Sequence, residues 1–388
     1  MRPAILIGVL LTAVFAGLVH AQEPLREHTL ESEWVQGSRH IRIALPDSYQ
    51  QHPAQQYPVL YLLDGENNLD YTQAVSRYLA SNGLIPELMI VAIRGGASRG
   101  QDYLPANNAE GSAPSGQAHQ FRRFIADELM PFVEQQYRAA PLSILSGHSY
   151  GGLFVLDTLA SQPSLFQGYI AQSPYLDKQW TPLIIESLQD SLTQINNQRR
   201  FLQILVGDEP ELLPGIGKLD KLLNEHASNG LRWFIQRDPG KTHMTTRMIG
   251  QYNGLELLFN DWSLPEQTLA SGDIDQLRSH IAQLSEAYGY KVLYSQQPLA
   301  LATQMQLQQQ QFELAEQFAS LYLGHYPNSL TAHYMMANSL LAAGKQDAAL
   351  QTIEKALTLS AANPKPESQA IVQALGQLQQ KLRLSKKE

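Results

Sequence analysis

The chain has 388 residues, enough for two ordinary domains, and 44% of them are hydrophobic, which suffices for large cores. Its net charge of −8 argues against a nucleic-acid groove and against an anionic membrane surface as partners. The absence of cysteine excludes disulfides, thiolate metal sites, a cysteine nucleophile and a lipidated N-terminal cysteine.

The first residues predict a secretory signal peptide. Arg2 provides a positive end, 4–19 is an uncharged apolar stretch, and Val19-His20-Ala21 offers a small-residue cleavage site. The stretch is shorter than the ~20 residues that a membrane-spanning helix needs, so we expect cleavage rather than an uncleaved anchor. Residues 1–21 are therefore the predicted signal peptide, and the mature protein is expected to be periplasmic or secreted, without membrane attachment.

Residues 22–265 predict an α/β domain, because strands and helices alternate as a doubly wound, mostly parallel sheet requires. Residues 41–45 alternate as an edge strand does, whereas the later strands are continuously apolar and should be covered on both faces. Residues 94–116 predict a long loop, for which we hypothesise a role in substrate selection. The expected strands are 41–45, 59–63, 89–93, 142–145, 168–171, 201–206 and 232–235, and the expected helices include 70–80, 121–133 and 153–159.

The motif Gly147-His148-Ser149-Tyr150-Gly151-Gly152 lies between an apolar strand and a helical pattern. A serine on a sharp strand-to-helix turn, flanked by glycines, is typical of the nucleophile elbow of α/β-hydrolases. The turn strains the serine backbone, and the residues two before and two after it are expected to lie too close together for a Cβ. Ser149 is therefore the predicted nucleophile, and the elbow should turn the His148 side chain away into packing.

A serine nucleophile needs a base, and the base needs an orienting acid. In α/β-hydrolases both follow the serine in the chain, in the order acid and then histidine. His243, after the strand 232–235, is the predicted base. Glu209 is the predicted acid, with Asp208 and Glu211 as alternatives in the same loop, and a serine–histidine dyad without an acid stays open.

The oxyanion of a tetrahedral intermediate needs backbone N–H donors. One is expected from Tyr150, after the nucleophile, and the other from Gly65 or Glu66, in the loop after the strand 59–63. If the Glu66 side chain points into the cleft, it would favour neutral or cationic substrates. The sequence has no histidine pair in an HExxH arrangement and no phosphate-binding or dinucleotide motif, so we expect neither a metal nor a cofactor.

Residues 266–388 predict a smaller all-α domain with a tetratricopeptide-like (TPR-like) repeat. Ala315 and Ala349 lie 34 residues apart, as do Leu323 and Leu357, and 34 residues is the period of tetratricopeptide repeats. Gln310 stands where the first repeat should have its turn glycine. Residues 369–384 predict a polar capping helix. A generic helical bundle is the alternative, and true repeats would offer a surface for a peptide or protein partner.

The α/β region resembles the esterase-D-like group of α/β-hydrolases, which includes ferric-siderophore esterases and feruloyl esterases. The matching stretches are Tyr57-Pro58-Val59-Leu60-Tyr61-Leu62-Leu63-Asp64-Gly65, the elbow motif, Ser173-Pro174 and the loop that bears His243. The resemblance implies Ser149 and His243 as catalytic residues and oxyanion amides at Tyr150 and Glu66. Glu209-Pro210 resembles the acid segment of siderophore esterases, with a spacing from Gly207 that is one residue shorter. The C-terminal stretch resembles the TPR-like extension of some bacterial members.

We therefore expect an exported serine carboxylesterase that acts on a small-molecule ester through an acyl-enzyme on Ser149. A siderophore lactone, a feruloyl-type ester and a simple short-chain ester all stay open as substrates. Two other functions are weighed against it. One is a catalytically inactive hydrolase fold that serves as a scaffold through its repeats, and the other is an acyltransferase whose cleft excludes water.

Overall fold

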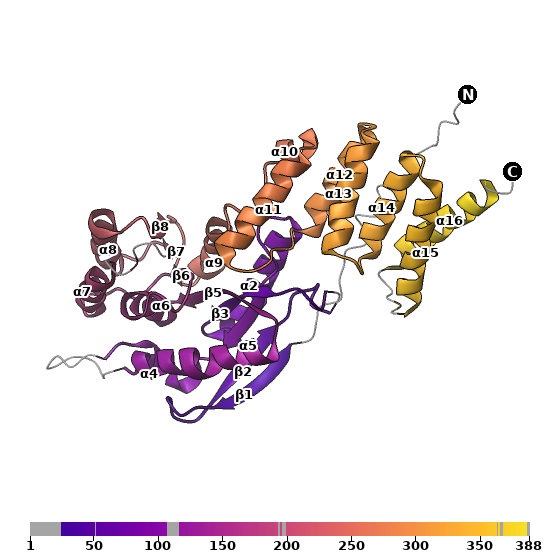
Figure 1. Cartoon of the computed structure of the whole chain (residues 1–388). Helices are drawn as coiled ribbons and strands as arrows, with labels where there is room; N and C mark the ends of the chain where they lie inside the picture. Colours follow the sequence, from indigo (N-terminus) through magenta and orange to yellow (C-terminus); the bar gives the residue numbers. More distant parts are fainter. Residues whose placement is uncertain are drawn as a thin grey trace.

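The structure, a computed structural model, describes residues 25–385 except 51, 107–115, 193–194, 196–198, 363 and 365–367. The predicted signal peptide lies outside the described residues. The described strands form one eight-stranded sheet with the order β1-β2-β4-β3-β5-β6-β7-β8. They are β1 (Arg26–Glu31), β2 (Ser38–Ala44), β3 (Tyr57–Leu62), β4 (Met89–Ile93), β5 (Ala139–His148), β6 (Gly168–Gln172), β7 (Arg200–Val206) and β8 (Leu231–Arg237) (Figure 1).

The sheet is mostly parallel, as predicted. β2 pairs antiparallel with both β1 and β4, and the remaining neighbours pair in parallel. The prediction that residues 41–45 form an edge strand was wrong, because β1 pairs along the outer side of β2 and takes the edge itself. The sequence of β1, Arg-Glu-His-Thr-Leu-Glu, has one apolar residue, so no hydrophobic pattern reveals this strand.

Helices cover both faces of the sheet, and successive residues of a strand pack into different cores. Leu60 and Leu62 of β3 join the core formed with α2 (Gly65–Ser81) and α9 (Thr246–Leu258), whereas Tyr61 joins the core on the opposite face. That second face is covered by α4 (Ala118–Arg123), α5 (Met130–Gln136), α6 (Tyr150–Ser161), α7 (Trp180–Leu192) and α8 (Leu213–His226). The result is the predicted three-layer α/β architecture.

The segment 94–116 is more structured than the predicted loop. It contains a 3₁₀ turn, η2 (Gly96–Ser98), and a short helix, α3 (Arg99–Tyr103), while residues 107–115 lie outside the described residues. The predicted helix 121–133 is continuous through α4 and α5 but widens into a π-helical segment, η3 (Phe124–Leu129). Pro131, the second residue of α5, has no N–H to donate to the preceding turn, which explains a widening at this point.

The C-terminal region is all helical, as predicted, and carries a 34-residue structural period. Both bounds of α12 and the start of α13 recur 34 residues later in α14 and α15, and Gln310 and Gly344 occupy corresponding turns with φ of 59° and 77°. Gln310 thus adopts the left-handed conformation of the glycine that it replaces. Assignment as TPR-like repeats stays a prediction. The helices are α10 (Glu266–Ser271), α11 (Ile274–Tyr288), α12 (Gln296–Gln308), α13 (Phe312–His325), α14 (Leu330–Ala342), α15 (Gln346–Ala362) and α16 (Gln369–Ser385).

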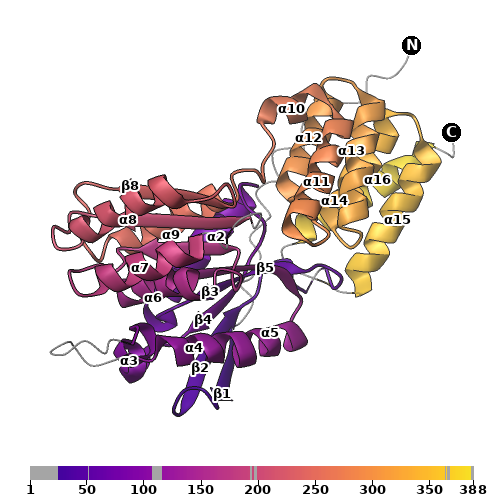
Figure 2. The same cartoon turned by 60° about the vertical axis from the view of Figure 1, so that its left-hand side comes forward.

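The helical region packs against the α/β region on the side of α2 and α9 (Figure 2). Trp262 lies fully buried at the junction, and its ring stacks on Tyr288 and Tyr294 with centroids 6.3 and 6.1 Å apart. A further contact joins His52 and Tyr326, whose rings lie 4.6 Å apart. Whether 22–265 and 266–388 are separate folding units stays a prediction. None of the described helices is both long enough and apolar enough to span a bilayer.

Candidate functional site

Three neighbouring parallel strands are followed by non-glycine residues in the left-handed region. Asp64 follows β3 with φ 52°, Ser149 follows β5 with φ 60°, and Ser173 follows β6 with φ 41°. Among the described residues, Gln310 is the other non-glycine with a positive φ. Such conformations cost free energy and concentrate at functional sites. The three residues lie at the carboxyl edge of the sheet, where α/β proteins place their ligands.

Ser149 is the turn between β5 and α6, as the elbow prediction requires. Its backbone, at φ 60° and ψ −117°, is held from both sides. Its N–H donates to the carbonyl of Gln172 at 3.0 Å, and its carbonyl accepts from the N–H groups of Leu153 and Tyr175 at 2.9 and 3.1 Å. These bonds to β6 and α6 stabilise a conformation that an isolated serine would avoid.

The steric role of the elbow glycines differs from the prediction. A Cβ on Gly147 would lie 2.5 Å from the backbone of Gly151, so the residue two before the serine must be glycine. A Cβ on Gly151 would meet its nearest atom, a carboxylate oxygen of Asp64, at 3.5 Å, which is ordinary contact. The second tight position is Gly152, whose Cβ would lie 2.9 Å from the Cα of Pro174. The prediction was right for Gly147 and wrong for Gly151.

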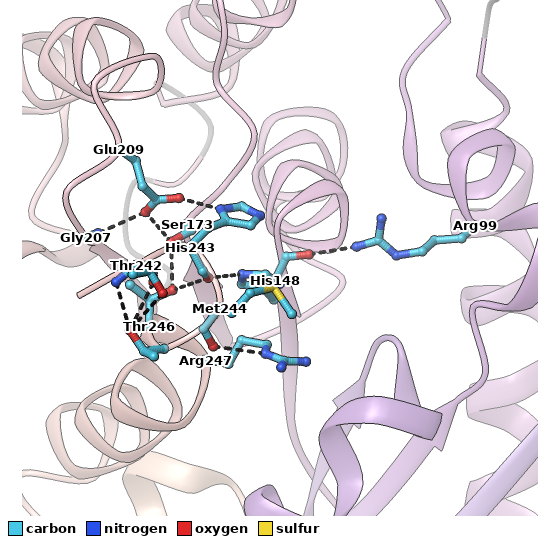
Figure 3. A network of polar contacts seen from close by, with 11 residues as sticks. Arg99, His148, Ser173, Gly207, Glu209, Thr242, His243, Met244, Thr246 and Arg247 are labelled. Carbon is cyan, nitrogen blue, oxygen red and sulfur yellow. Dashed lines mark hydrogen bonds and ion pairs between the residues drawn. The ribbon is translucent and has the colours of Figure 1, made fainter.

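Glu209 contacts the His243 imidazole, through Oε1 and Nδ1 (Figure 3). Its side chain is 3% exposed, and its other oxygen accepts hydrogen bonds from the Ser173 hydroxyl at 2.6 Å and the Gly207 N–H at 2.9 Å. Burial acts to raise the pKa of Glu209, but the hydrogen bonds from His243, Ser173 and Gly207 outweigh it, so the pKa is lowered. Glu209 is therefore an ionised partner for the imidazole.

The two alternative acids lie elsewhere in the same loop. Asp208 is directed to the neighbouring turn, where it accepts from the Gly240 N–H at 2.7 Å and from Arg237 at 3.4 Å. Glu211 is exposed to solvent. Of the three acidic side chains, Glu209 is the one brought to His243, which favours the triad over the dyad.

The backbone of His243 is held as firmly as its ring. Its carbonyl accepts from Nε2 of His148 at 2.7 Å and from the Thr246 hydroxyl at 2.9 Å. His148 is buried, as predicted, and its ring packs 4.5 Å from the His243 ring. A carbonyl can only accept, so His148 carries its proton on Nε2. Burial and the neighbouring His243 lower the pKa of His148 to about 3.

The two predicted oxyanion amides lie in the first turns of helices. Tyr150 is the first residue of α6 and Glu66 the second of α2, positions whose N–H groups have no backbone acceptor within their own helix. The Glu66 carboxylate accepts from the N–H groups of Gly95 and Gly96 at 3.1 and 3.0 Å, and it borders a different hollow from the one at Ser149. The suggestion that this side chain points into the cleft, and so disfavours anions, was wrong.

Ser149 and His243 border one hollow of about 360 Å³. Two arginines that the sequence analysis did not identify line it as well. Arg99 pairs with the buried Asp64 at 2.7 and 2.9 Å and donates to the carbonyl of His148 at 3.2 Å. Arg247 donates to Asn68 at 3.4 Å. No motif marks these arginines, because 99 lies in the segment expected to be a loop and 247 is in the first turn of α9. The remaining lining residues are Asp64, Asn67, Asn68, His148 and Met244.

Residues 32–256 match the model of the esterase family that is described as "Putative esterase". The chain is 32% identical over 194 residues to ferri-bacillibactin esterase BesA of Bacillus subtilis, which covers 44% of this chain and 65% of the relative. It is 33% identical over 171 residues to the apo-salmochelin esterase of Escherichia coli, which covers 39% of this chain and 51% of the relative. The chain thus spans less than two thirds of the length of these two relatives.

Among solved structures, the fold is similar to that of an IroE-like serine hydrolase from Shewanella oneidensis. The TM-score is 0.67 at 28% identity, and the likeness covers 78% of this chain and 99% of the other. The covered share of this chain is larger than the segment that the family model matches, so the likeness continues beyond the α/β region. The family match and the eight-stranded sheet show that this chain belongs to the esterase family of α/β-hydrolases.

Proposed function

We propose that this protein is a serine carboxylesterase that forms an acyl-enzyme on Ser149 and then hydrolyses it. The observation that carries the proposal is the contact of the buried Glu209 with Nδ1 of His243, in a site where His243 and the strained Ser149 border the same hollow. With Nδ1 bound to the carboxylate, Nε2 is the nitrogen left to exchange a proton with the serine. The nucleophile, base and acid positions are held by Ser149, His243 and Glu209, which supports catalysis over a scaffold function.

Acylation begins when the Ser149 Oγ attacks the ester carbonyl carbon while His243 Nε2 takes the serine proton. The carbonyl oxygen becomes an oxyanion, for which the N–H groups of Tyr150 and Glu66 are the proposed donors. The bond to the leaving oxygen then breaks, and His243 returns the proton to release an alcohol. Each oxyanion donor is typically worth about 10²–10³ in rate.

Deacylation repeats these steps with water. His243 removes a proton from water, the oxygen attacks the acyl carbon, and the bond to Ser149 Oγ breaks as the serine regains a proton. The products are a carboxylic acid and the free enzyme. Glu209 stays ionised throughout and stabilises the imidazolium that forms in each half-reaction.

For the substrate we propose an ester or lactone of an anionic siderophore. The relatives support this class, since BesA is named a ferri-bacillibactin esterase and its Escherichia coli counterpart an apo-salmochelin esterase. The hollow supports it independently. Arg99 is paired with Asp64, the one carboxylate among the described residues that line the hollow, whereas Arg247 contacts the carbonyl of Met244 and the amide oxygen of Asn68. The lining therefore carries a net positive charge, which attracts anions. Feruloyl-type and short-chain esters are the alternatives.

The test uses the wild-type protein, Ser149→Ala, and Ser161→Ala as a matched control at the exposed end of α6. Each is assayed on p-nitrophenyl acetate, butyrate and octanoate, on a feruloyl ester and on a ferric trilactone siderophore, and each is exposed to a fluorophosphonate that labels serine nucleophiles. We expect Ser149→Ala to lose activity by several orders of magnitude together with the label, and Ser161→Ala to keep both. An active Ser149→Ala variant would disprove the nucleophile, and a wild type with neither turnover nor label would point to the scaffold function. Product analysis with an added alcohol separates hydrolysis from acyl transfer.

Export and the function of the helices are separate proposals. The predicted signal peptide would deliver the enzyme to the periplasm or the medium, and N-terminal sequencing of the protein from its native host tests cleavage after Ala21. A peptide or protein partner for the helical region is likewise a prediction that rests on the 34-residue period alone.

A further inference from the structure

The Ser173 hydroxyl is one member of a closed ring of polar contacts that also includes Glu209, His243 and Thr246 (Figure 3). It donates to Oε2 of Glu209 at 2.6 Å and lies 2.8 Å from the hydroxyl oxygen of Thr246. Thr246 donates to the carbonyl of His243 at 2.9 Å, and the imidazole of His243 contacts Glu209, which closes the cycle. Ser173 and Thr246 are both fully buried, so water does not compete for these contacts.

The backbone of Ser173 is strained in order to make this contact. It has a φ of 41° without being glycine, and it is followed by Pro174. Its N–H donates to the carbonyl of Leu205 in β7 at 2.7 Å, which fixes it against the strand that leads to Glu209. Strain of this kind persists where the surrounding structure compensates for it, and glycine would be the unstrained choice at this position. The hydroxyl is what glycine would not provide.

The protons available to the ring assign its directions. Ser173 has one hydroxyl proton, and the ionised Glu209 can only accept, so this proton belongs to the carboxylate. Thr246 then has one proton for two acceptors, the Ser173 oxygen and the His243 carbonyl, and the carbonyl also receives the Nε2–H of His148. Ser173 is therefore dedicated to Glu209, while the proton of Thr246 is shared.

We propose that Ser173 is a positioning residue, whose hydroxyl fixes the Glu209 carboxylate and thereby the orientation of the His243 imidazole. The Ser173 hydroxyl and the Gly207 N–H together hold Oε2, which leaves Oε1 directed at Nδ1. Thr246 joins the same hydroxyl to the backbone of His243, so the acid and the base are aligned by one group. This inference rests on the proposed esterase function and extends it to a residue that does not touch the substrate.

The first experiment separates the hydroxyl from the backbone strain. Ser173→Ala removes the hydroxyl and keeps the strain, whereas Ser173→Gly removes both. We expect kcat to fall about 10- to 100-fold in both variants with KM within about twofold, since a bond to an ionised partner is lost while substrate contacts are kept. The melting temperature should be higher for Ser173→Gly than for Ser173→Ala, because glycine adopts the positive φ without strain. Ser339→Ala is the control, because it removes another fully buried hydroxyl, bonded to Met335 in α14, and should keep full activity.

The second experiment asks whether Ser173 acts through Glu209. In the Glu209→Gln background, Ser173→Ala should cost less than about threefold further in kcat. When Glu209 is intact, Ser173→Ala should move the acid limb of the pH profile of kcat to higher pH, because Glu209 loses a hydrogen-bond donor that lowers its pKa. Thr246→Ser should keep kcat within about threefold, and Thr246→Val should lose less than Ser173→Ala because the His148 bond remains.

The outcomes separate two failures. Unchanged kcat in both Ser173 variants would overturn the inference. So would a loss of kcat from Ser173→Ala that is as large in the Glu209→Gln background as in the wild-type protein. An active Ser149→Ala variant would instead overturn the proposed function itself, whatever the Ser173 variants do.

Discussion

His148 donates its Nε2–H to the backbone carbonyl of His243 at 2.7 Å, and the two imidazole rings lie 4.5 Å apart. The residue before the proposed nucleophile thus fastens the loop that carries the proposed base. Burial disfavours protonation of His148, so this link joins the elbow to the loop through a neutral imidazole.

The buried His148 should make stability fall in mild acid. Its pKa drops from 6.5 to about 3 on folding, so between these values the unfolded chain binds the extra proton, and stability rises with pH across this window. Lowering the pH from 6.5 to 4 should therefore cost about 3 kcal/mol through this group. Urea unfolding of wild type and His148→Phe at pH 4, 5, 6 and 7 measures it. The variant should show the flatter dependence, and parallel curves would contradict this assignment.

Neutralising Glu209 should damage catalysis far more than neutralising its neighbour. Glu209→Gln keeps the shape but removes the charge that fixes the His243 tautomer, and we expect kcat to fall by about 10³–10⁴. Asp208→Asn is the matched control, since Asp208 contacts Gly240 and Arg237 rather than His243, and kcat should stay within about threefold. Esterase kinetics on a p-nitrophenyl ester decide it, and equal losses in the two variants would reopen the choice of acid.

Arg247 should discriminate between anionic and neutral esters. It lines the hollow of Ser149, and it donates to the carbonyl of Met244 and the amide oxygen of Asn68, neither of them charged. Arg247→Gln should raise KM for a carboxylated ester about fivefold or more and leave KM for p-nitrophenyl acetate within about twofold. Arg247→Lys should restore part of the difference, and the effect should shrink at high salt. Equal changes for both esters would show that Arg247 shapes the site without selecting charge.

Gln310 and Gly344 offer a reciprocal test of the helical period. Both have positive φ at corresponding turns, and a Cβ at Gly344 meets no atom within 4 Å, so backbone strain alone distinguishes the two residue types there. Gln310→Gly should stabilise the helical region by about 0.5–1 kcal/mol, and Gly344→Gln should destabilise it by about 1 kcal/mol. Thermal unfolding followed by circular dichroism measures both. Shifts of the same sign would refute the structural equivalence of the two turns.

The positions of the central strands along the chain could be predicted because these strands are continuous apolar runs, and Ser149 follows one of them directly. The position of β1 could not be predicted, since a strand that is paired on one side only can be polar throughout. The segment 94–116 is predicted to be a loop because it is rich in Gly, Asn, Ser and Pro, yet the short helix α3 forms there and brings Arg99 against Asp64.

The sequence by itself determined the fold class and the candidates Ser149 and His243, because strand periodicity, glycine spacing and chain order are local properties. Only the tertiary structure decided which of Asp208, Glu209 and Glu211 contacts His243, because the three share one loop and the same chemistry. The choice depends on which carboxylate the ends of β6 and β7 turn towards the His243 loop, and there the hydroxyl of Ser173 and the N–H of Gly207 hold Glu209. Contacts between strand ends far apart in the chain leave no pattern in the sequence, and they are what makes a list of acidic residues into one oriented acid.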